Sequence, residues 1–319
     1  MADVTDVKRV AVLMGGRSAE REVSLNTGEQ VAAALKQRGF DVACIDTGDA
    51  DFISRIVDVG ADVAFICLHG RFGEDGTVQG LLELMDLPYV GSGVLASALA
   101  MNKVMSKRIY ESVGLATPAY VAITRGSGFD VDAISGLLGS KTVVKPADEG
   151  SSVGMTIVSD PAALAQAIEF AFRFDPLVLV ERFESGAEVT VGVIGNHDPI
   201  ALPTLEIVPQ NEFYDYESKY VPGMSSHIIP ARVSDVARIE CQRLAIEAHK
   251  ALGCIGMSRS DTIVTPDGEV FLLETNTIPG MTATSLLPDA AAAAGILFPD
   301  LCARLVSLAL EAWSERRGS

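Results

Sequence analysis

The first hundred residues alternate short apolar runs with segments whose apolar residues recur at helical spacing. The apolar runs predict buried strands at 10–14, 42–45 and 63–68. Between the first two, Val31 and Leu35 lie on one face of a predicted helix that ends at Gly39. Strands separated by helices indicate βαβ units and a parallel sheet, so residues 1–100 are expected to form an α/β domain.

The pattern changes after residue 100. A helix is predicted over 103–113, and Thr117-Pro118 follows it as a plausible boundary. Further strands are predicted at 142–145, 155–158, 177–182, 189–194 and 201–207, and further helices at 161–172, 235–252 and 301–313. This order indicates a small central α+β domain over 101–186 and a larger domain over 187–319.

A polar stretch over about 210–230 interrupts the last predicted domain. It has no clean hydrophobic period and contains Tyr214, Tyr216, Lys219 and Tyr220. A loop of this length inside a compact domain is usually functional or disordered. The three tyrosines and the lysine favour a lid that folds over a ligand over an ordinary ordered surface loop.

Two apolar runs near the C-terminus predict a β-hairpin. Its strands are expected at 254–264 and 269–275, joined by the turn Pro266-Asp267-Gly268. Side chains two residues apart in a strand share a face, so Arg259 lies beside Asp261 and Glu274 beside Asn276. If the two faces coincide, carboxylate and amide oxygens gather that suit Mg²⁺ bound to nucleotide phosphates. The competing interpretation is a solvated hairpin face with ordinary surface charges.

The composition and charge of the chain limit the kinds of molecule that it is expected to bind. The chain has 319 residues, more than a single core usually serves, and is 48% hydrophobic. Its 25 basic and 42 acidic residues give a formal charge of −17, which argues against nucleic acid or an anionic membrane. A protein of this charge that binds a nucleotide must gather its few cations locally and bring metal ions.

The cysteines and the termini indicate a cytoplasmic protein. The chain contains no CxxC pair among Cys44, Cys67, Cys241, Cys254 and Cys302, so buried reduced thiols are expected. The N-terminal segment does not resemble a signal peptide. The Ala-rich stretch 290–298 is far shorter than the roughly 20 apolar residues of a membrane span.

Two segments resemble known phosphate-binding motifs only in part. Gly139-Ser140-Lys141-Thr142 lacks a glycine directly before its lysine and leads into a strand, so the mechanism of a P-loop is missing. The segment 91–96 matches G-x-G-x-x-A, but Glu111, the acid about 20 residues on, lies in a helical pattern. We interpret this segment as a turn that opens a helix, and a nicotinamide enzyme stays a distant alternative.

The loop 149–154, with the sequence Glu-Gly-Ser-Ser-Val-Gly, is a better candidate for phosphate binding. Small residues between two strands let backbone N–H groups approach an anion, although a tight hairpin has the same composition. Lys145, at the end of the preceding strand, and Lys103 could each supply a positive charge for phosphate.

Several motifs together resemble the D-alanine–D-alanine ligase family of the ATP-grasp superfamily. They occur in the family's order at 15–24, 68–70 with 73–76, 149–154, 213–220 and 274–282. The resemblance implies an α/β N-terminal parallel-sheet domain followed by a two-domain α+β ATP-grasp fold, with ATP between the two α+β domains. It also implies that one D-alanine is phosphorylated by ATP to an acyl phosphate, which the amine of a second D-alanine attacks.

The resemblance assigns a role to each site residue. Two Mg²⁺ (or Mn²⁺) ions would be held by Asp261, Glu274 and Asn276. ATP would be bound by Lys103, Lys145, Ser152, Glu181, Phe183 and Glu188. The first D-alanine would be received near His69 by Glu20, which is hydrogen-bonded toward Ser151 and Tyr220. The oxyanion would be stabilised by Arg259 and the backbone N–H of Gly280, and the second substrate's carboxylate would be held by Lys219, Ser285 and Leu286.

The resemblance further implies a homodimer that makes D-alanyl-D-alanine for peptidoglycan. Two alternatives stay open. A related ligase would join D-alanine to a hydroxy acid or to a different amino acid. A nucleotide-binding module without catalysis would have no need for Asp261, Glu274 and Asn276 together.

Overall fold

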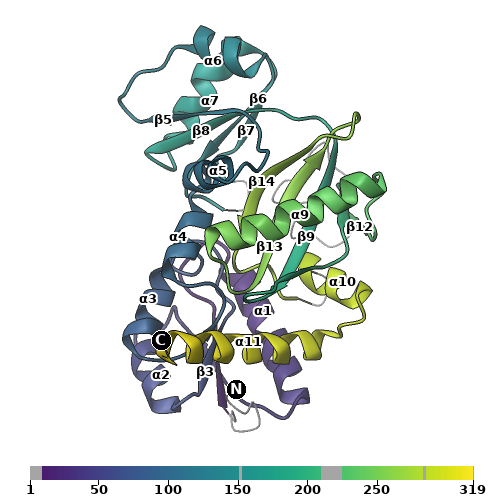
Figure 1. Cartoon of the computed structure of the whole chain (residues 1–319). Coiled ribbons are helices and arrows are strands. Elements are labelled where there is room, and N and C mark those ends of the chain that lie inside the picture. Colours follow the sequence, from purple (N-terminus) through teal and green to yellow (C-terminus); the bar gives the residue numbers. More distant parts are fainter. Residues whose placement is uncertain (1–8, 151–152, 210–224, 283–284, 319) are drawn as a thin grey trace.

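Three β-sheets follow one another along the chain (Figure 1). The structure, a computed structural model, describes residues 9–150, 153–209, 225–282 and 285–318. The sheets have the strand orders β2-β1-β3-β4, β5-β8-β6-β7 and β12-β11-β9-β13-β14, with β10 paired to β9. The predicted change from a parallel sheet to α+β units after residue 100 is therefore confirmed, while the domain boundaries at 100 and 186 stay a prediction.

The first sheet is parallel throughout, as predicted. Its strands are β1 (Arg9–Met14), β2 (Asp41–Asp46), β3 (Val63–Ile66) and β4 (Tyr89–Val90). The helices of this region are α1 (Arg21–Gln37), α2 (Phe52–Val59), α3 (Thr77–Leu84) and α4 (Val94–Met101). Helix α4 begins directly after Gly93, so the G-x-G-x-x-A segment is the turn that the sequence predicted.

The second sheet is antiparallel and forms the small unit at the top of Figure 1. Its strands are β5 (Tyr120–Thr124), β6 (Thr142–Pro146), β7 (Thr156–Val158) and β8 (Leu177–Arg182). It is accompanied by α6 (Val131–Leu138), the 3₁₀ turn η2 (Pro161–Ala163) and α7 (Leu164–Ala171). The helix α5 (Lys103–Ser112) precedes it and contacts the third sheet.

The third sheet carries the predicted hairpin. Its strands are β9 (Ala187–Gly195), β10 (Ile200–Ala201), β11 (Leu205–Pro209), β12 (Ser225–Ile228), β13 (Gly256–Val264) and β14 (Val270–Asn276). Helix α9 (Asp235–Leu252) covers one face, where Val189, Val191 and Val193 pack against Leu244 and its neighbours. The alternate residues of β9, such as Thr190, therefore point to the opposite face.

Two sequence predictions in this region were wrong. The single strand expected over 201–207 is divided into β10 and β11, because Pro203 has no N–H to donate to a ladder. The end of the expected 210–230 loop forms β12, which pairs antiparallel with β11. Residues 210–224 of that loop lie outside the described residues.

The last helix, α11 (Phe298–Gly318), returns to the first sheet (Figure 1). Its Leu301 and Leu305 are fully buried in one core with Val10 and Phe65. Helix α10 (Leu286–Ala293) lies between this core and the third sheet. Of the described helices, none is long and apolar enough by itself to span a membrane, and only the bent pair α10 and α11 meets the criteria of length and composition jointly.

The turn after β1 is held by a single carboxylate. Asp46 accepts hydrogen bonds from the backbone N–H of Gly16 and of Gly48, at 3.2 and 2.8 Å, and from both terminal nitrogens of Arg21. Gly15 has φ +75°, and a Cβ there would lie 2.3 Å from Asp46 Oδ1, so only glycine fits. The hydrogen bond from Arg21 is the main reason that the pKa of Asp46 is lowered to about 2.

We expect Asp46→Asn to lower the free energy of unfolding at pH 7, because the ion pair with Arg21 is lost. The loss should be only about 1–2 kcal/mol, since Arg21 is partly solvated and the ion pair is screened. A depressed carboxyl pKa adds stability above the unfolded pKa, so the difference should shrink as pH falls from about 4 to about 2. Urea unfolding at pH 7 and pH 3 measures this. Asp41→Asn, which removes the exposed Arg9–Asp41 pair, is the control, and equal losses in both variants would contradict the assignment.

Candidate active site

A β-bulge places the acidic residues of the hairpin on one face. Near the turn the pairing is regular, from Val264↔Val270 to Thr262↔Leu272. The next pair is Asp261↔Glu274, so β14 has one extra residue, Leu273, at this point. Residues directly opposite in an antiparallel ladder point to the same side. If the register of Thr262↔Leu272 continued without this shift, Glu274 would pair with Ser260 and point toward the α9 face. The condition that the two faces coincide is therefore met.

Asp261 lies at the centre of this polar face. Its carboxylate accepts hydrogen bonds from Arg259 Nε and Nη2 at 2.9 and 2.8 Å, and from Asn276 Nδ2 at 3.4 Å. Thr190, opposite Asp261 on β9, donates its Oγ1–H to Asp261 Oδ1 at 2.5 Å. Three side chains, one from each of three strands, thus converge on this carboxylate, and Asp261 is 7% exposed.

Two lysines approach the same face from outside the third sheet. Lys103, the first residue of α5, donates to the carbonyl of Glu149 at 2.6 Å and lies 3.9 Å from Glu274 Oε2. Lys145 on β6 forms an ion pair with Glu181 of β8. Burial alone would lower the pKa of Lys145, but the negative charges of Glu181, Glu274 and Glu188 outweigh it, so that pKa is raised.

The carboxylate of Glu181 faces two lysines. Besides Lys145, it forms an ion pair with Lys107 Nζ at 3.0 Å. Burial raises the pKa of Glu181, yet the two ammonium groups overcome this and the net shift is downward. Glu181 is 2% exposed, so in this structure its carboxylate serves the lysines rather than an open surface.

A second group of predicted residues gathers at the carboxyl end of the first sheet. Glu20, directly before α1, lies close to two glycines: a Cβ would be 2.7 Å from its Oε2 on Gly70 and 3.7 Å on Gly150. His69 is 7% exposed and contacts Glu74 through Nδ1 at 3.1 Å and Thr27 through Nε2 at 3.3 Å. Burial raises the pKa of Glu74, and the hydrogen bond with His69 opposes that shift.

The third group lies at the start of α10. Ser285 Oγ accepts a hydrogen bond from the Thr282 N–H at 3.1 Å, and a Cβ on Gly280 would be 3.0 Å from that oxygen. Leu286 packs with Leu205 and Ile207 of β11. A Cβ on Gly192 would be 2.5 Å from Leu287, so a glycine at this point of β9 lets α10 lie against the sheet.

The remaining predicted residues are less closely tied to this face. The ring of Phe183 is covered by Lys141, whose Nζ lies 3.7 Å from its centroid. Glu188 is paired with Ile207 and Ile263 on the same face as Thr190. Ser151, Ser152, Lys219 and Tyr220 lie outside the described residues.

Sequence reasoning missed several residues that support this site. Lys107 lies one helical turn after Lys103 on α5, and this i, i+4 spacing was a signal that both face the same way. Tyr110 donates to Thr275 Oγ1 beneath the hairpin at 2.9 Å. Thr190 had no sequence signal, because its position depends on the pairing of β9 with β13.

The donor set fits a divalent cation. Asp261 and Glu274 offer carboxylate oxygens and Asn276 an amide oxygen, which are the hard ligands that Mg²⁺ takes together with phosphate and water. No three His, Cys, Asp or Glu side chains form a metal cluster in the part of the chain that the structure describes. A cation at this face would therefore need oxygens from a ligand.

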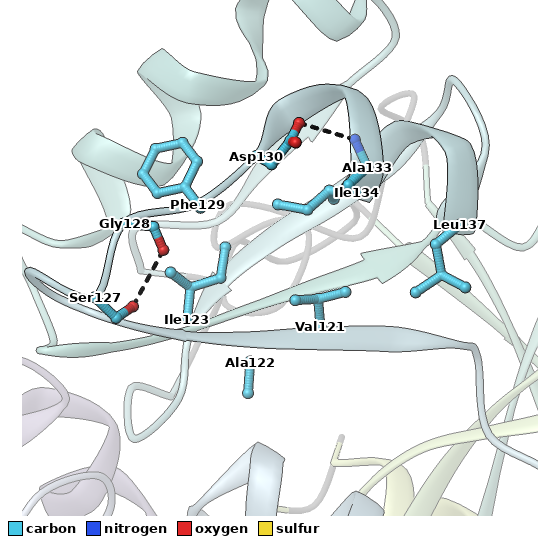
Figure 2. Close-up of a pocket in the computed structure, with 10 residues that line it drawn as sticks. All are labelled: Val121, Ala122, Ile123, Ser127, Gly128, Phe129, Asp130, Ala133, Ile134 and Leu137. Atoms are coloured by element: carbon cyan, nitrogen blue, oxygen red, sulfur yellow. Dashed lines mark hydrogen bonds between the residues drawn. The ribbon is translucent and has the colours of Figure 1, made fainter.

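A separate pocket lies on the second sheet, between β5 and α6. Figure 2 shows Val121 and Ile123 pointing into it, while Ala122 points the other way. Its polar groups are already bonded: Ser127 donates to Gly128 O, and Asp130 caps α6 by accepting from the Ala133 N–H. We assign no ligand to this pocket.

Three sheets in this order, with two lysines facing a carboxylate pair across the last two, define an ATP-grasp enzyme. The chain belongs to the D-alanine–D-alanine ligase family. The family model for the "D-ala D-ala ligase C-terminus" matches residues 109–307, and that for the N-terminus matches 50–92.

Curated relatives and solved structures agree with this family. The D-alanine–D-alanine ligase of Pelotomaculum thermopropionicum is 50% identical over 315 residues, covering 97% of this chain and 99% of the relative. That of Geobacter sulfurreducens is 50% identical over 319 residues, covering 99% of each. The crystal structure of the Bacillus anthracis ligase complexed with ATP is 32% identical, has a TM-score of 0.85, and covers 97% of this chain and 99% of that one.

Thr190 offers a test of the polar face. We expect Thr190→Val to weaken Mn²⁺ binding in the presence of ADP by roughly 10- to 100-fold, because the hydrogen bond that orients Asp261 is lost. Electron paramagnetic resonance of free Mn²⁺ measures the affinity. Thr262→Val is the matched control, since Thr262 Oγ1 donates to Val189 O on the α9 side. Equal Mn²⁺ affinities in both variants and the wild type would remove Thr190 from this role.

Proposed function

We propose that the chain joins two D-alanine molecules to D-alanyl-D-alanine for peptidoglycan synthesis, with ATP cleaved to ADP and phosphate. The observation that carries this proposal is the pairing of Asp261 with Glu274 on a face that Lys103 and Lys145 approach. Relatives named as these ligases, 50% identical over nearly the whole chain, support it.

In the first step, a carboxylate oxygen of the first D-alanine attacks the γ-phosphorus of ATP. An O–P bond forms, the bond to the β-phosphate oxygen breaks, and ADP leaves with that electron pair. We assign Lys103 and Lys145 to the phosphate oxygens, where fixed positive charges stabilise the transferred group. Glu20 would receive the ammonium group of this D-alanine, and His69, held by Glu74, would lie beside it.

In the second step, the amine of the second D-alanine attacks the acyl carbon, and phosphate leaves as the amide forms. The proton that the amine loses passes to the leaving phosphate. Arg259 and the N–H of Gly280 would stabilise the negative oxygen of the tetrahedral intermediate. Lys219, Ser285 and Leu286 would hold the carboxylate of the second substrate, and Ser151 and Tyr220 would complete the site over Glu20.

Asp261, Glu274 and Asn276 would hold two Mg²⁺ or Mn²⁺ ions. When bound, such ions neutralise negative charge on the phosphates of ATP. Ser152, Glu181, Phe183 and Glu188 complete the proposed ATP site, Phe183 directly after β8 and Glu188 within β9. We further propose a homodimer in the cytoplasm, which sedimentation of the purified protein tests.

The first test removes the carboxylate of Glu274. Glu274→Gln should reduce D-alanine-dependent ADP formation by at least about 10³-fold, because one of the two charged ligands for the cations is lost while the side chain keeps its size. The reaction of the wild type should also require Mg²⁺. Glu269→Gln, an exposed acid at the other end of the same hairpin, should retain wild-type activity. Comparable rates for the two variants would argue against this site.

The second test addresses the acceptor. ADP formation with D-alanine should exceed that with L-alanine, D-lactate or other D-amino acids, and the product should be the dipeptide by mass spectrometry. A larger rate with D-alanine plus D-lactate, with an ester as the main product, would instead identify a depsipeptide ligase.

A further inference from the structure

Helix α5 directs three polar side chains to one side. Lys103, Lys107 and Tyr110 are spaced i, i+4 and i+7, so they lie on one face of the helix. Lys103 reaches the loop carbonyl of Glu149, and Tyr110 reaches Thr275 beneath the hairpin. Lys107 lies between them and is only 1% exposed, so it cannot itself be a surface cation for a ligand.

The environment of Lys107 is built for an ammonium group. Its Nζ lies 3.0 Å from Glu181 Oε2, 2.6 Å from Thr117 Oγ1 and 3.3 Å from the carbonyl of Pro118. The ring of Tyr120 lies 5.4 Å from the same nitrogen. Burying a charge is costly unless it is paired and hydrogen-bonded, and here the ammonium has an ion pair with Glu181 and hydrogen bonds to Thr117 and Pro118.

The charges of this cluster do not cancel. Glu181 carries one negative charge and forms ion pairs with both Lys107 and Lys145. Two positive charges and one negative charge leave the three side chains with a net charge of +1. If Lys107 were absent, Glu181 would neutralise Lys145 alone, and the cluster would offer no net charge to a phosphate.

Lys107 is also connected to the hairpin. Thr117, which accepts from Lys107, donates its Oγ1–H to the carbonyl of Leu272 at 2.7 Å. The Leu272 N–H in turn donates to Ala116 O at 2.8 Å. Two hydrogen bonds therefore connect the Lys107–Glu181 ion pair to Leu272 of β14. Leu272 lies two residues before Glu274.

We propose that Lys107 is a positioning residue for the triphosphate of ATP. It neutralises Glu181, so that Lys145 keeps a positive charge available to the phosphates, and it acts without touching the nucleotide. The inference rests on the proposed function, because it takes ATP as the ligand of Lys145.

The test compares ligands with and without phosphates. Titration calorimetry gives the Kd of adenosine and of the non-hydrolysable β,γ-imido analogue of ATP. In Lys107→Met, the analogue should bind roughly tenfold more weakly while adenosine binding is unchanged, since only phosphates sense the lost charge. In Lys107→Met/Glu181→Gln the net charge is again +1, so the ratio of the two Kd values should return toward that of the wild type.

A purely structural role for Lys107 gives a different pattern. Equal losses of affinity for adenosine and for the analogue, or a double variant no better than Lys107→Met, would overturn the proposal. Lys250→Met is the matched control, because Lys250 is half-exposed on α9 and pairs only with the neighbouring Glu247 among the described residues. If Lys107→Met does not fold, Lys107→Gln replaces it, since glutamine keeps an N–H donor for Thr117 but no charge.

These outcomes are separate from a failure of the proposed function. That failure would appear in the wild type, as absence of ADP formation that depends on D-alanine. Wild-type turnover together with an unchanged Kd ratio in the Lys107 variants would reject the role of Lys107 alone.

Discussion

The extra residue in β14 is the constraint on which the site depends. Side chains alternate between the faces of a strand, so a shift of one residue decides whether Glu274 points toward Asp261 or toward the core under α9. The bulge lies between the regular end of the hairpin, where Val264 pairs with Val270, and the site itself. The pairs near the turn therefore keep their apolar side chains in the core. The pairs beyond the bulge place Asp261 and Glu274 on the same face of the sheet.

Each of two buried carboxylates, one on the third sheet and one on the second, is held by several side chains. Asp261 is surrounded by Arg259, Asn276 and Thr190, and Glu181 lies between Lys107 and Lys145. In each case a carboxylate has more than one partner, which meets the cost of its burial through several contacts. The two clusters face each other, one with acidic ligands for cations and one with a surplus of positive charge.

Much of this arrangement could be predicted from the sequence, and the failures have physical causes. The parallel first sheet, helix α5 and the hairpin followed from hydrophobic period and turn residues, which act locally. The break at Pro203 was missed because the apolar pattern continues across it. Lys107 and Thr190 were missed because their roles arise from contacts between elements distant in the chain. The apolar pattern of 270–276 does not reveal the bulge. The sequence alone therefore could not decide whether Asp261 and Glu274 point to the same face of the hairpin.

The return of α11 to the first sheet has a consequence for how the protein forms. Leu301 and Leu305 complete a core that includes strand residues near positions 10 and 65. During synthesis from the N-terminus, the earliest strands emerge from the ribosome with this side uncovered, and they stay so until α11 has been made. Shortening the chain by its final helix would expose that apolar surface and lead to aggregation rather than to a smaller folded protein.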